Sequence, residues 1–199
     1  DFSDERYSPV FSPTVYSGQT MSVMLYLDQW NGNETPGVAP YIRTCHDKAL
    51  HIDGYTKLIQ YQWIQVTYTI PDTNGDVIDE IGLILEGYAP GKFKTLGNVY
   101  LDEFTISGKG SYTINPKKQT KNFAAITPFS MDHGAWDLYG GTLNLMRCEP
   151  AFAYTGNYYA RNYRYSATVI PRHGNSHLLL GRALGAQKAY LAGLGAPGK

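Results

Sequence analysis

The sequence predicts an all-β protein made of tandem jelly-roll or β-sandwich domains, of which the second is incomplete. Apolar and polar residues alternate over several short runs, which is the spacing of a half-buried strand. Turn-forming pairs such as Asn31-Gly32, Asn74-Gly75 and Gly140-Gly141 separate these runs. Turns at such short intervals are typical of antiparallel sandwiches and barrels.

Three strands of the first domain follow from strict alternation. Their apolar faces are formed by Met21, Val23, Leu25 and Leu27, by Ile64, Val66, Tyr68 and Ile70, and by Ile81, Leu83 and Leu85. Pro71 ends the second of these strands because proline cannot donate a hydrogen bond to a neighbouring strand.

The last strand of the first domain changes the side on which its apolar residues lie. Val99 and Leu101 share one face, whereas Phe104 and Ile106 share the other. A β-bulge near Asp102 would return all four to the core, because a bulge inserts one extra residue into a strand.

Domain boundaries follow from the same pattern. We expect a carbohydrate-binding-module-like sandwich over 1–108, a polar and basic linker over 109–121, and a partial lectin-like sandwich over 122–199. Strands of the second domain are predicted at 135–138, 142–146, 164–170, 176–183 and 188–194. Gly140-Gly141 forms a hairpin turn. A hairpin is preferred over a helix for 183–194, because Gly185 and Gly193 weaken a helix.

The second domain has few strands for a two-sheet sandwich. Either a complete sandwich would extend past Lys199, or the two domains share a core.

Composition excludes some functions. The chain has 17 basic and 17 acidic residues, so no basic footprint points to nucleic acid. No long apolar run or N-terminal signal predicts a membrane segment, and the compartment stays open. Cys45 and Cys148 lie in different halves of the chain, so two free thiols are favoured over a disulfide.

Exposed aromatic side chains suggest a sugar-binding surface. The parity of Ile64 and Val66 turns Tyr61 and Trp63 outward, where flat rings can stack on the C–H faces of pyranoses. Tyr41 and Arg43 lie opposite Ile42 and would join them if the two strands are close in one sheet. The candidate carbohydrate-binding residues are Trp63, Tyr61, Trp30, Tyr41, Arg43 and Gln65, with Asp28 as a further hydrogen-bond partner. The alternative is that Trp63 only covers the edge of the sheet.

Several acids could bind a metal ion. Asp102 and Glu103 could form a structural calcium site with Asp1, Asp4 and Glu5, and the alternative is solvated acids at strand ends. Asp72, Asn74 and Asp76 lack the glutamate of a calcium loop and indicate a turn. His173 and His177 would need a helix or a hairpin to form a zinc site.

No catalytic motif is present in the sequence: it has no nucleophile elbow, phosphate-binding glycine loop or zinc-protease pattern. Glu80 and Glu86 are six residues apart on one predicted strand, roughly 20 Å by strand rise. This separation is too long for a glycosidase pair.

Several stretches of the chain resemble one known family. They are Tyr7–Thr20, Ile70–Gly82 and Gly97–Asp102 in the first domain, and Tyr154–Gly156, Asn162–Pro171 and Arg182–Tyr190 in the second. They are similar to the non-catalytic C-terminal region of some bacterial ADP-ribosylglycohydrolase-family proteins, a region that resembles carbohydrate-binding jelly rolls. The catalytic helical domain of that family, with its metal-binding acids, has no counterpart in this sequence.

The resemblance implies a non-catalytic accessory module that binds a glycan or oligosaccharide beside a linked hydrolase domain. One alternative is a structural or docking module without sugar affinity. Another is a concanavalin-like glycoside hydrolase or lyase.

Overall fold

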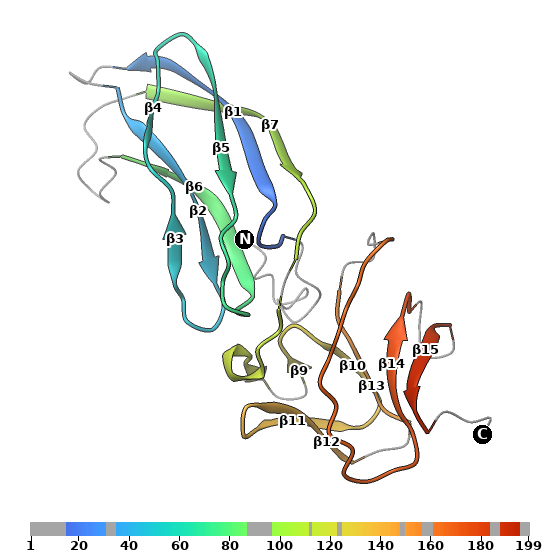
Figure 1. The fold of residues 1–199 in the computed structure, drawn as a ribbon. Coiled ribbons are helices and arrows are strands. Elements are labelled where there is room, and N and C mark those ends of the chain that lie inside the picture. The colour runs from blue at the N-terminus through green and yellow to red at the C-terminus, as the bar shows by residue number, and fades with distance from the viewer. Residues whose placement is uncertain are drawn as a thin grey trace.

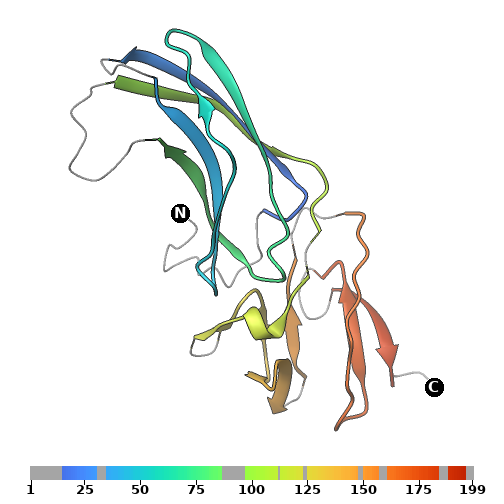
Figure 2. The same cartoon turned by 60° about the vertical axis from the view of Figure 1, so that its left-hand side comes forward.

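Two antiparallel sheets face each other over residues 20–107, and the remaining strands lie beyond one end of this sandwich (Figures 1 and 2). The structure is a computed structural model, which describes residues 15–30, 35–86, 97–111, 113–122, 125–147, 150–156, 161–183 and 188–195. The predicted all-β class is confirmed, and no α-helix occurs within these ranges.

The first sheet has the strand order β5-β1-β7. Its members are β5 (Trp63–Thr69), β1 (Thr20–Trp30) and β7 (Gly97–Ser107). The inward side chains of β1 are almost completely buried, as the alternation predicts; they are Met21, Val23, Leu25 and Leu27. The opposite face of the sheet is turned to solvent.

The second sheet is centred on β2 (Gly37–Thr44). Strand β6 (Ile78–Leu85) pairs with β2 along its length. Strands β3 (Leu50–Ile52) and β4 (Thr56–Lys57) also pair with β2, at different positions. All of these pairings are antiparallel, so the two sheets form the sandwich that the sequence predicts for the first half.

The core between the two sheets consists of two apolar clusters. One includes Met21, Ile42 and Tyr68, and the other includes Leu25 and Val66. Partly buried Leu83 of β6 packs against both clusters. The core is therefore continuous along the sandwich.

The predicted β-bulge in β7 is confirmed. The register with β1 shifts between Ser22, which lies opposite Thr105, and Met24, which lies opposite Asp102. The extra residue falls at Glu103, whose φ is 50°. Leu101 and Ile106 consequently lie opposite Leu25 and Met21. Val99 and Ile106 pack against the core clusters, whereas Leu101 and Phe104 are 55% and 43% exposed. The bulge therefore does not return all four apolar residues to the core, contrary to the prediction from the sequence.

Asn74-Gly75 forms the predicted turn, with φ values of 53° and 81°. It joins β5 to β6, and these strands belong to different sheets. The turn therefore carries the chain from one layer of the sandwich to the other instead of closing a β-hairpin.

The second half of the chain begins with a short 3-10 helix, η2 (Pro116–Lys118), and continues in short strands. These strands are β8 (Lys121–Asn122), β9 (Ala125–Ile126), β10 (Ser130–Asp132), β11 (Ala135–Tyr139), β12 (Thr142–Arg147), β13 (Phe152–Tyr154), β14 (His177–Gly181) and β15 (Tyr190–Leu194). Within the described ranges they pair as β8-β9, β10-β13, β11-β12 and β14-β15. Whether they belong to an incomplete second sandwich stays a prediction.

Both predicted hairpins of this half are present. Gly140 and Gly141, with φ values of 59° and 72°, connect β11 to β12, as a two-residue turn with two positive φ angles does. Strands β14 and β15 pair antiparallel, which favours the hairpin over the helix for 183–194. The turn between these two strands lies outside the described residues.

The strand predicted at 164–170 is wrong. This segment has no regular secondary structure and lies near β14 through tyrosine side chains. The Tyr165 hydroxyl donates to the carbonyl of Leu180 at 2.6 Å, and the Tyr163 hydroxyl accepts from the N–H of Arg182 at 2.5 Å. The segment therefore contacts β14 and the residue after it through side chains and not through a backbone ladder.

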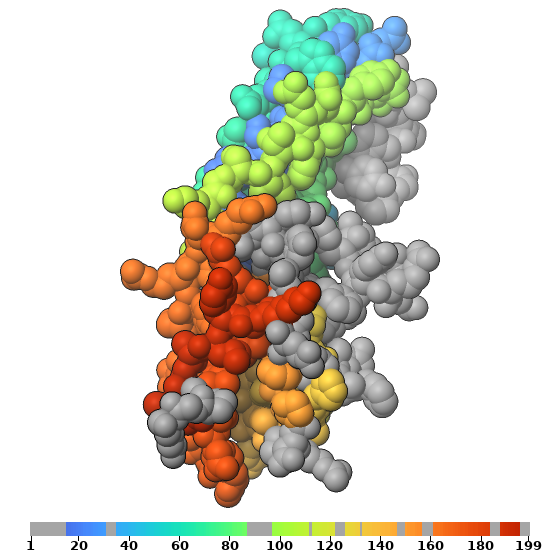
Figure 3. Space-filling view, turned by 90° about the vertical axis from the view of Figure 1, so that its right-hand side faces the viewer, coloured from blue at the N-terminus to red at the C-terminus, as the bar shows by residue number. Residues whose placement is uncertain are grey.

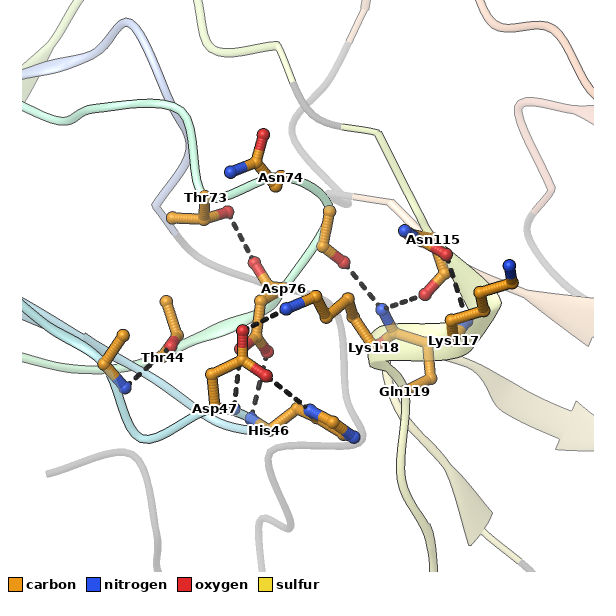
Figure 4. Close-up of polar contacts among 12 residues, drawn as sticks. Thr44, His46, Asp47, Thr73, Asn74, Asp76, Asn115, Lys117, Lys118 and Gln119 are labelled. Atoms are coloured by element: carbon orange, nitrogen blue, oxygen red, sulfur yellow. Dashed lines mark hydrogen bonds and ion pairs between the residues drawn. The ribbon is translucent and has the colours of Figure 1, made fainter. Parts of the chain in front are cut away.

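The segment expected to be a linker packs against the sandwich (Figure 4). Buried Gln119 donates through its amide nitrogen to the carbonyl of Gly75 at 2.7 Å and to that of Asn115 at 3.0 Å. Lys118 forms an ion pair with Asp47, which follows β2. These contacts join η2 to the end of the sandwich.

Candidate functional site: an aromatic row on the first sheet

Three aromatic rings lie side by side on the outer face of the first sheet. Trp63 of β5 and Tyr100 of β7 both lie opposite Tyr26 of β1. The ring centroids of Tyr26 and Trp63 are 5.3 Å apart, and those of Tyr26 and Tyr100 are 6.2 Å apart. We call these three residues the aromatic row.

The aromatic row is open to solvent at both ends. Trp63 is 49% exposed and Tyr100 is 50% exposed, and they stand on the two outermost strands of the sheet. In the space-filling view, β7 crosses the upper half of the molecule at its surface (Figure 3). Neighbouring rings are tilted by 43° and 52°, so the row presents a twisted surface.

Strand parity explains why these rings point outward. Tyr26 lies between Leu25 and Leu27, which are buried in the core. Successive side chains of a strand point to opposite faces, and residues directly opposite each other on paired strands share a face. The register therefore places Trp63 and Tyr100 on the same surface as Tyr26.

Polar groups flank the aromatic row along the strands. Gln65 and Asp102 both lie opposite Met24, in the row next to the rings. The Gln65 amide nitrogen donates to the Ser22 hydroxyl at 2.8 Å, which leaves the amide oxygen as an acceptor. One oxygen of Asp102 accepts from the N–H of Glu103 at 2.8 Å. The other oxygen of Asp102 can accept from a ligand.

This arrangement suits a ligand that has an apolar face and a rim of hydroxyl groups. Aromatic rings offer flat, low-entropy contact area, and a few convergent polar groups fix the orientation of a ligand. A pyranose has both features, because its C–H bonds form its faces and its hydroxyl groups mostly lie around its edge.

The predicted binding residues do not form one surface. Trp63 and Gln65 lie on the face of the aromatic row. Tyr61 precedes β5, has a φ of 61° and is 58% exposed. Its N–H donates to the carbonyl of Leu27 at 2.8 Å. Tyr61 therefore lies next to the row but outside the strand register that defines it.

Tyr41 and Arg43 belong to the other sheet, so the condition for a shared aromatic strip is not met. Both side chains contact Glu80: the Tyr41 hydroxyl is hydrogen-bonded to it, and Arg43 pairs with it at 2.9 Å. The hydrogen bond to Glu80 and burial raise the pKa of Tyr41. These groups join β2 to β6.

Trp30 covers the core at the end of β1 and packs against one of its clusters. A Cβ atom on Gly97 would lie 2.6 Å from Cε3 of Trp30, so the indole lies directly on the backbone of β7. Trp30 therefore has a packing role at the end of β1, and its part in sugar binding stays a prediction.

Tyr26 and Tyr100 were missed as site residues from the sequence. The outward parity of Tyr26 is visible in the alternation of its strand. The strand order that sets Tyr26 between Trp63 and Tyr100 involves segments far apart in the chain, so no local pattern could reveal it.

The expected calcium ligands are only partly described. Asp102 lies on the face of the aromatic row, whereas Asp4 and Glu5 lie outside the described residues. Calcium at Asp102 therefore stays a prediction from the sequence.

A different group of ligand-type side chains occurs at the end of the sandwich (Figure 4). Ligand atoms of His46, Asp47 and Asp76 lie within 4.8 Å of one another. Both oxygens of Asp76 accept backbone N–H groups, from His46 at 3.0 Å and from Asp47 at 2.9 Å. The Lys118 ammonium pairs with Asp47. The carboxylate oxygens that a cation would bind are thus already paired with backbone N–H groups and with an ammonium group of the protein.

The carboxylates considered for catalysis stabilise the second sheet. Glu80 contacts Tyr41 and Arg43, as described above. Glu86 accepts from the N–H of Gly37 at 3.1 Å and pairs with Lys57 at 2.5 Å, and these contacts lower its pKa, chiefly the hydrogen bond from Lys57. Both acids therefore have structural partners.

A separate open groove of about 540 Å³ lies between the edges of β3 and β5. Tyr68 is one of its lining residues, and its hydroxyl donates to the carbonyl of His51 at 3.0 Å. Burial raises the pKa of Tyr68, with a smaller effect from Asp53. None of the residues that line this groove belongs to the aromatic row.

No protein-family model, curated protein or solved structure matches the chain. Over the residues that the structure describes, no helix has the length and apolar character needed to cross a membrane. Cys45 is a free thiol, and burial is the main cause of its raised pKa; Cys148 lies outside the described residues.

Proposed function

We propose that the sandwich of residues 20–107 is a non-catalytic carbohydrate-binding module whose ligand stacks on the aromatic row. The single observation that carries this proposal is the register that sets Trp63, Tyr26 and Tyr100 in line across the sheet. Gln65 and Asp102 supply hydrogen-bonding groups beside the rings. The resemblance to accessory regions of ADP-ribosylglycohydrolase-family proteins further suggests that the module serves a linked hydrolase.

An open face of this kind fits weak binding. Micromolar to millimolar dissociation constants correspond to about 4–8 kcal/mol. Stacked aromatic rings, buried apolar area and a few hydrogen bonds reach this range without a deep pocket.

The test is a titration of the whole chain with soluble polysaccharides, followed by calorimetry or affinity electrophoresis. Trp63→Ala and Tyr100→Ala should each weaken binding by about tenfold, which is about 1.4 kcal/mol. Tyr139→Ala is the matched control, because Tyr139 is 78% exposed in the hairpin of β11 and β12. Unchanged affinity in the double variant Trp63→Ala, Tyr100→Ala would refute this site.

A protein-docking function is the second candidate, and one observation favours it. The β14–β15 hairpin exposes the apolar side chains of Leu191 and Leu194. Exposed apolar groups of this kind often mark contact surfaces. A docking module would show no saccharide-dependent change in the fluorescence of Trp63, whereas the first proposal requires one.

Glycoside hydrolase or lyase activity is the remaining alternative from the sequence. Release of reducing sugar or of unsaturated products from mixed polysaccharides would support it. Binding without product release would favour the accessory module.

A further inference from the structure

The strands that carry the aromatic row contain acidic residues but no lysine or arginine. Strands β1, β5 and β7 include Asp28, Asp102 and Glu103. Because the row is formed entirely by these strands, the charge that they place next to a bound ligand is negative.

Two of the acids lie on opposite sides of the aromatic row. Asp28 follows Tyr26 by two positions in β1, and Asp102 follows Tyr100 by two positions in β7. Because β1 and β7 are antiparallel, these steps run in opposite directions. Two residues span about 7 Å along a strand, so each carboxylate lies close to the rim of a sugar stacked on the rings.

These acids have no cationic partner in the described part of the chain. Elsewhere the carboxylates of Glu80, Glu86 and Asp79 each pair with a lysine or arginine. Asp102 accepts only the N–H of Glu103, and no ion pair involves Asp28. Within the described residues, no lysine or arginine therefore neutralises the negative charge beside the row.

We propose that the aromatic row selects amino-sugar chains, binding pyranoses with protonated amines more tightly, and polyuronates more weakly, than neutral chains of the same linkage. This proposal rests on the proposed function. Equatorial substituents lie in the plane of a pyranose, so a sugar stacked on the row directs them toward the flanking carboxylates. An ammonium group near the rings gains a further cation–π attraction.

The distance between the ammonium group of the sugar and the carboxylates sets the size of this preference. A unit charge about 7 Å from one carboxylate in water changes affinity by about threefold. Two carboxylates give about fivefold to tenfold at low ionic strength. Salt near 0.5 M screens charges beyond about 4–5 Å, so most of the preference is lost there.

The experiment compares hexamers of β-1,4-linked glucosamine, glucose and a uronic acid by calorimetry, at a pH where the amines are protonated. In 20 mM salt the glucosamine hexamer should bind about fivefold to tenfold more tightly than the glucose hexamer, and the uronate hexamer about fivefold to tenfold more weakly than the glucose hexamer. The variant Asp28→Asn, Asp102→Asn should bring the ratio of the glucosamine-hexamer affinity to the glucose-hexamer affinity down to about one, whatever its effect on the glucose hexamer itself. Asp72→Asn, at an exposed acid in the turn before β6, is the matched control.

The outcomes separate the two proposals. Equal affinity for the glucosamine and glucose hexamers, both dependent on Trp63, overturns the charge selection and leaves the carbohydrate module in place. If the double variant Trp63→Ala, Tyr100→Ala still prefers the glucosamine hexamer, the preference comes from general charge attraction. This outcome also overturns the proposal that the aromatic row selects amino sugars. Absence of Trp63-dependent binding to any hexamer refutes the proposed site and the selection together.

Discussion

The ring of Tyr41 lies directly over Gly82 of the neighbouring strand. A Cβ atom added to Gly82 would stand 2.8 Å from both Cε1 and the hydroxyl oxygen of Tyr41. An aromatic ring that covers a glycine shields exposed backbone on an edge strand. The outward position of Tyr41 therefore has a structural cause that is independent of any ligand.

Gly82→Ala should destabilise the protein by about 1–3 kcal/mol, because the added methyl group forces the ring of Tyr41 out of place. Urea unfolding measures this loss. Gly54→Ala is the control, since nothing lies within 4 Å of a Cβ atom there, and it should cost less than about 0.5 kcal/mol. Equal losses in the two variants would contradict the packing argument. In the double variant Tyr41→Ala, Gly82→Ala the two effects should be less than additive.

Asp76→Ala should cost about 2–4 kcal/mol, since it leaves two backbone N–H groups without their charged acceptor. Asp76 is 5% exposed and accepts from His46 and Asp47. Hydrogen exchange at these two amides should accelerate together with the loss of stability. Asp72→Ala removes an exposed acceptor of the same turn, that of the Asn74 N–H, and should cost about 1 kcal/mol or less. A larger effect at Asp72 would contradict the assignment.

Gly75→Ala should destabilise the protein by more than about 3 kcal/mol, since it adds backbone strain to a steric clash. Its φ is 81°, and a Cβ atom would stand 2.6 Å from Cβ and 2.8 Å from the nitrogen of Asn115. Gly140→Ala is the control: its φ is 59° but the surrounding space is open, so only the strain of about 1–2 kcal/mol remains. Similar losses in thermal unfolding would show that Asn115 does not pack on the turn.

Lys118→Met should raise the pKa of Asp47 toward its ordinary value of 3.8, because the hydrogen bond from Lys118 is the main cause of its lowering and His46 is a smaller one. A folded pKa below the unfolded value stabilises the protein above the unfolded pKa. This stabilisation is lost as pH falls through the folded pKa, so it disappears in the acid range below about pH 4. A carboxyl NMR titration measures the change. His46→Ala should give a smaller upward shift, and the reverse order would contradict the assignment.

Alternation in the sequence predicts which face a side chain takes but not which strands are neighbours. Trp63 and Tyr41 both point outward, as their parity indicates. They lie on different sheets, because β5 pairs with β1 whereas β2 pairs with β3, β4 and β6. The spatial order of the strands depends on contacts between distant segments, so the face that carries the aromatic row could be predicted only in part.

Local backbone features were more predictable where a single physical rule decides them. The parity change in β7 requires an extra residue, and the bulge at Glu103 supplies it. The strand at 164–170 was wrong because an extended, β-branched and aromatic pattern does not ensure a backbone partner. There the hydroxyl groups of Tyr163 and Tyr165 make the hydrogen bonds to Arg182 and Leu180.

The packing of residues 113–122 and 125–128 on the sandwich affects how the protein can be divided for experiments. Thr113, Ile114 and Pro128 line the same small cleft as Val15 and Val77, which are buried. A fragment that stops at residue 108 would uncover these valines and leave the carbonyl of Gly75 without its donor from Gln119. Recombinant versions of the sandwich of residues 20–107 should therefore end after residue 128 and not directly after β7.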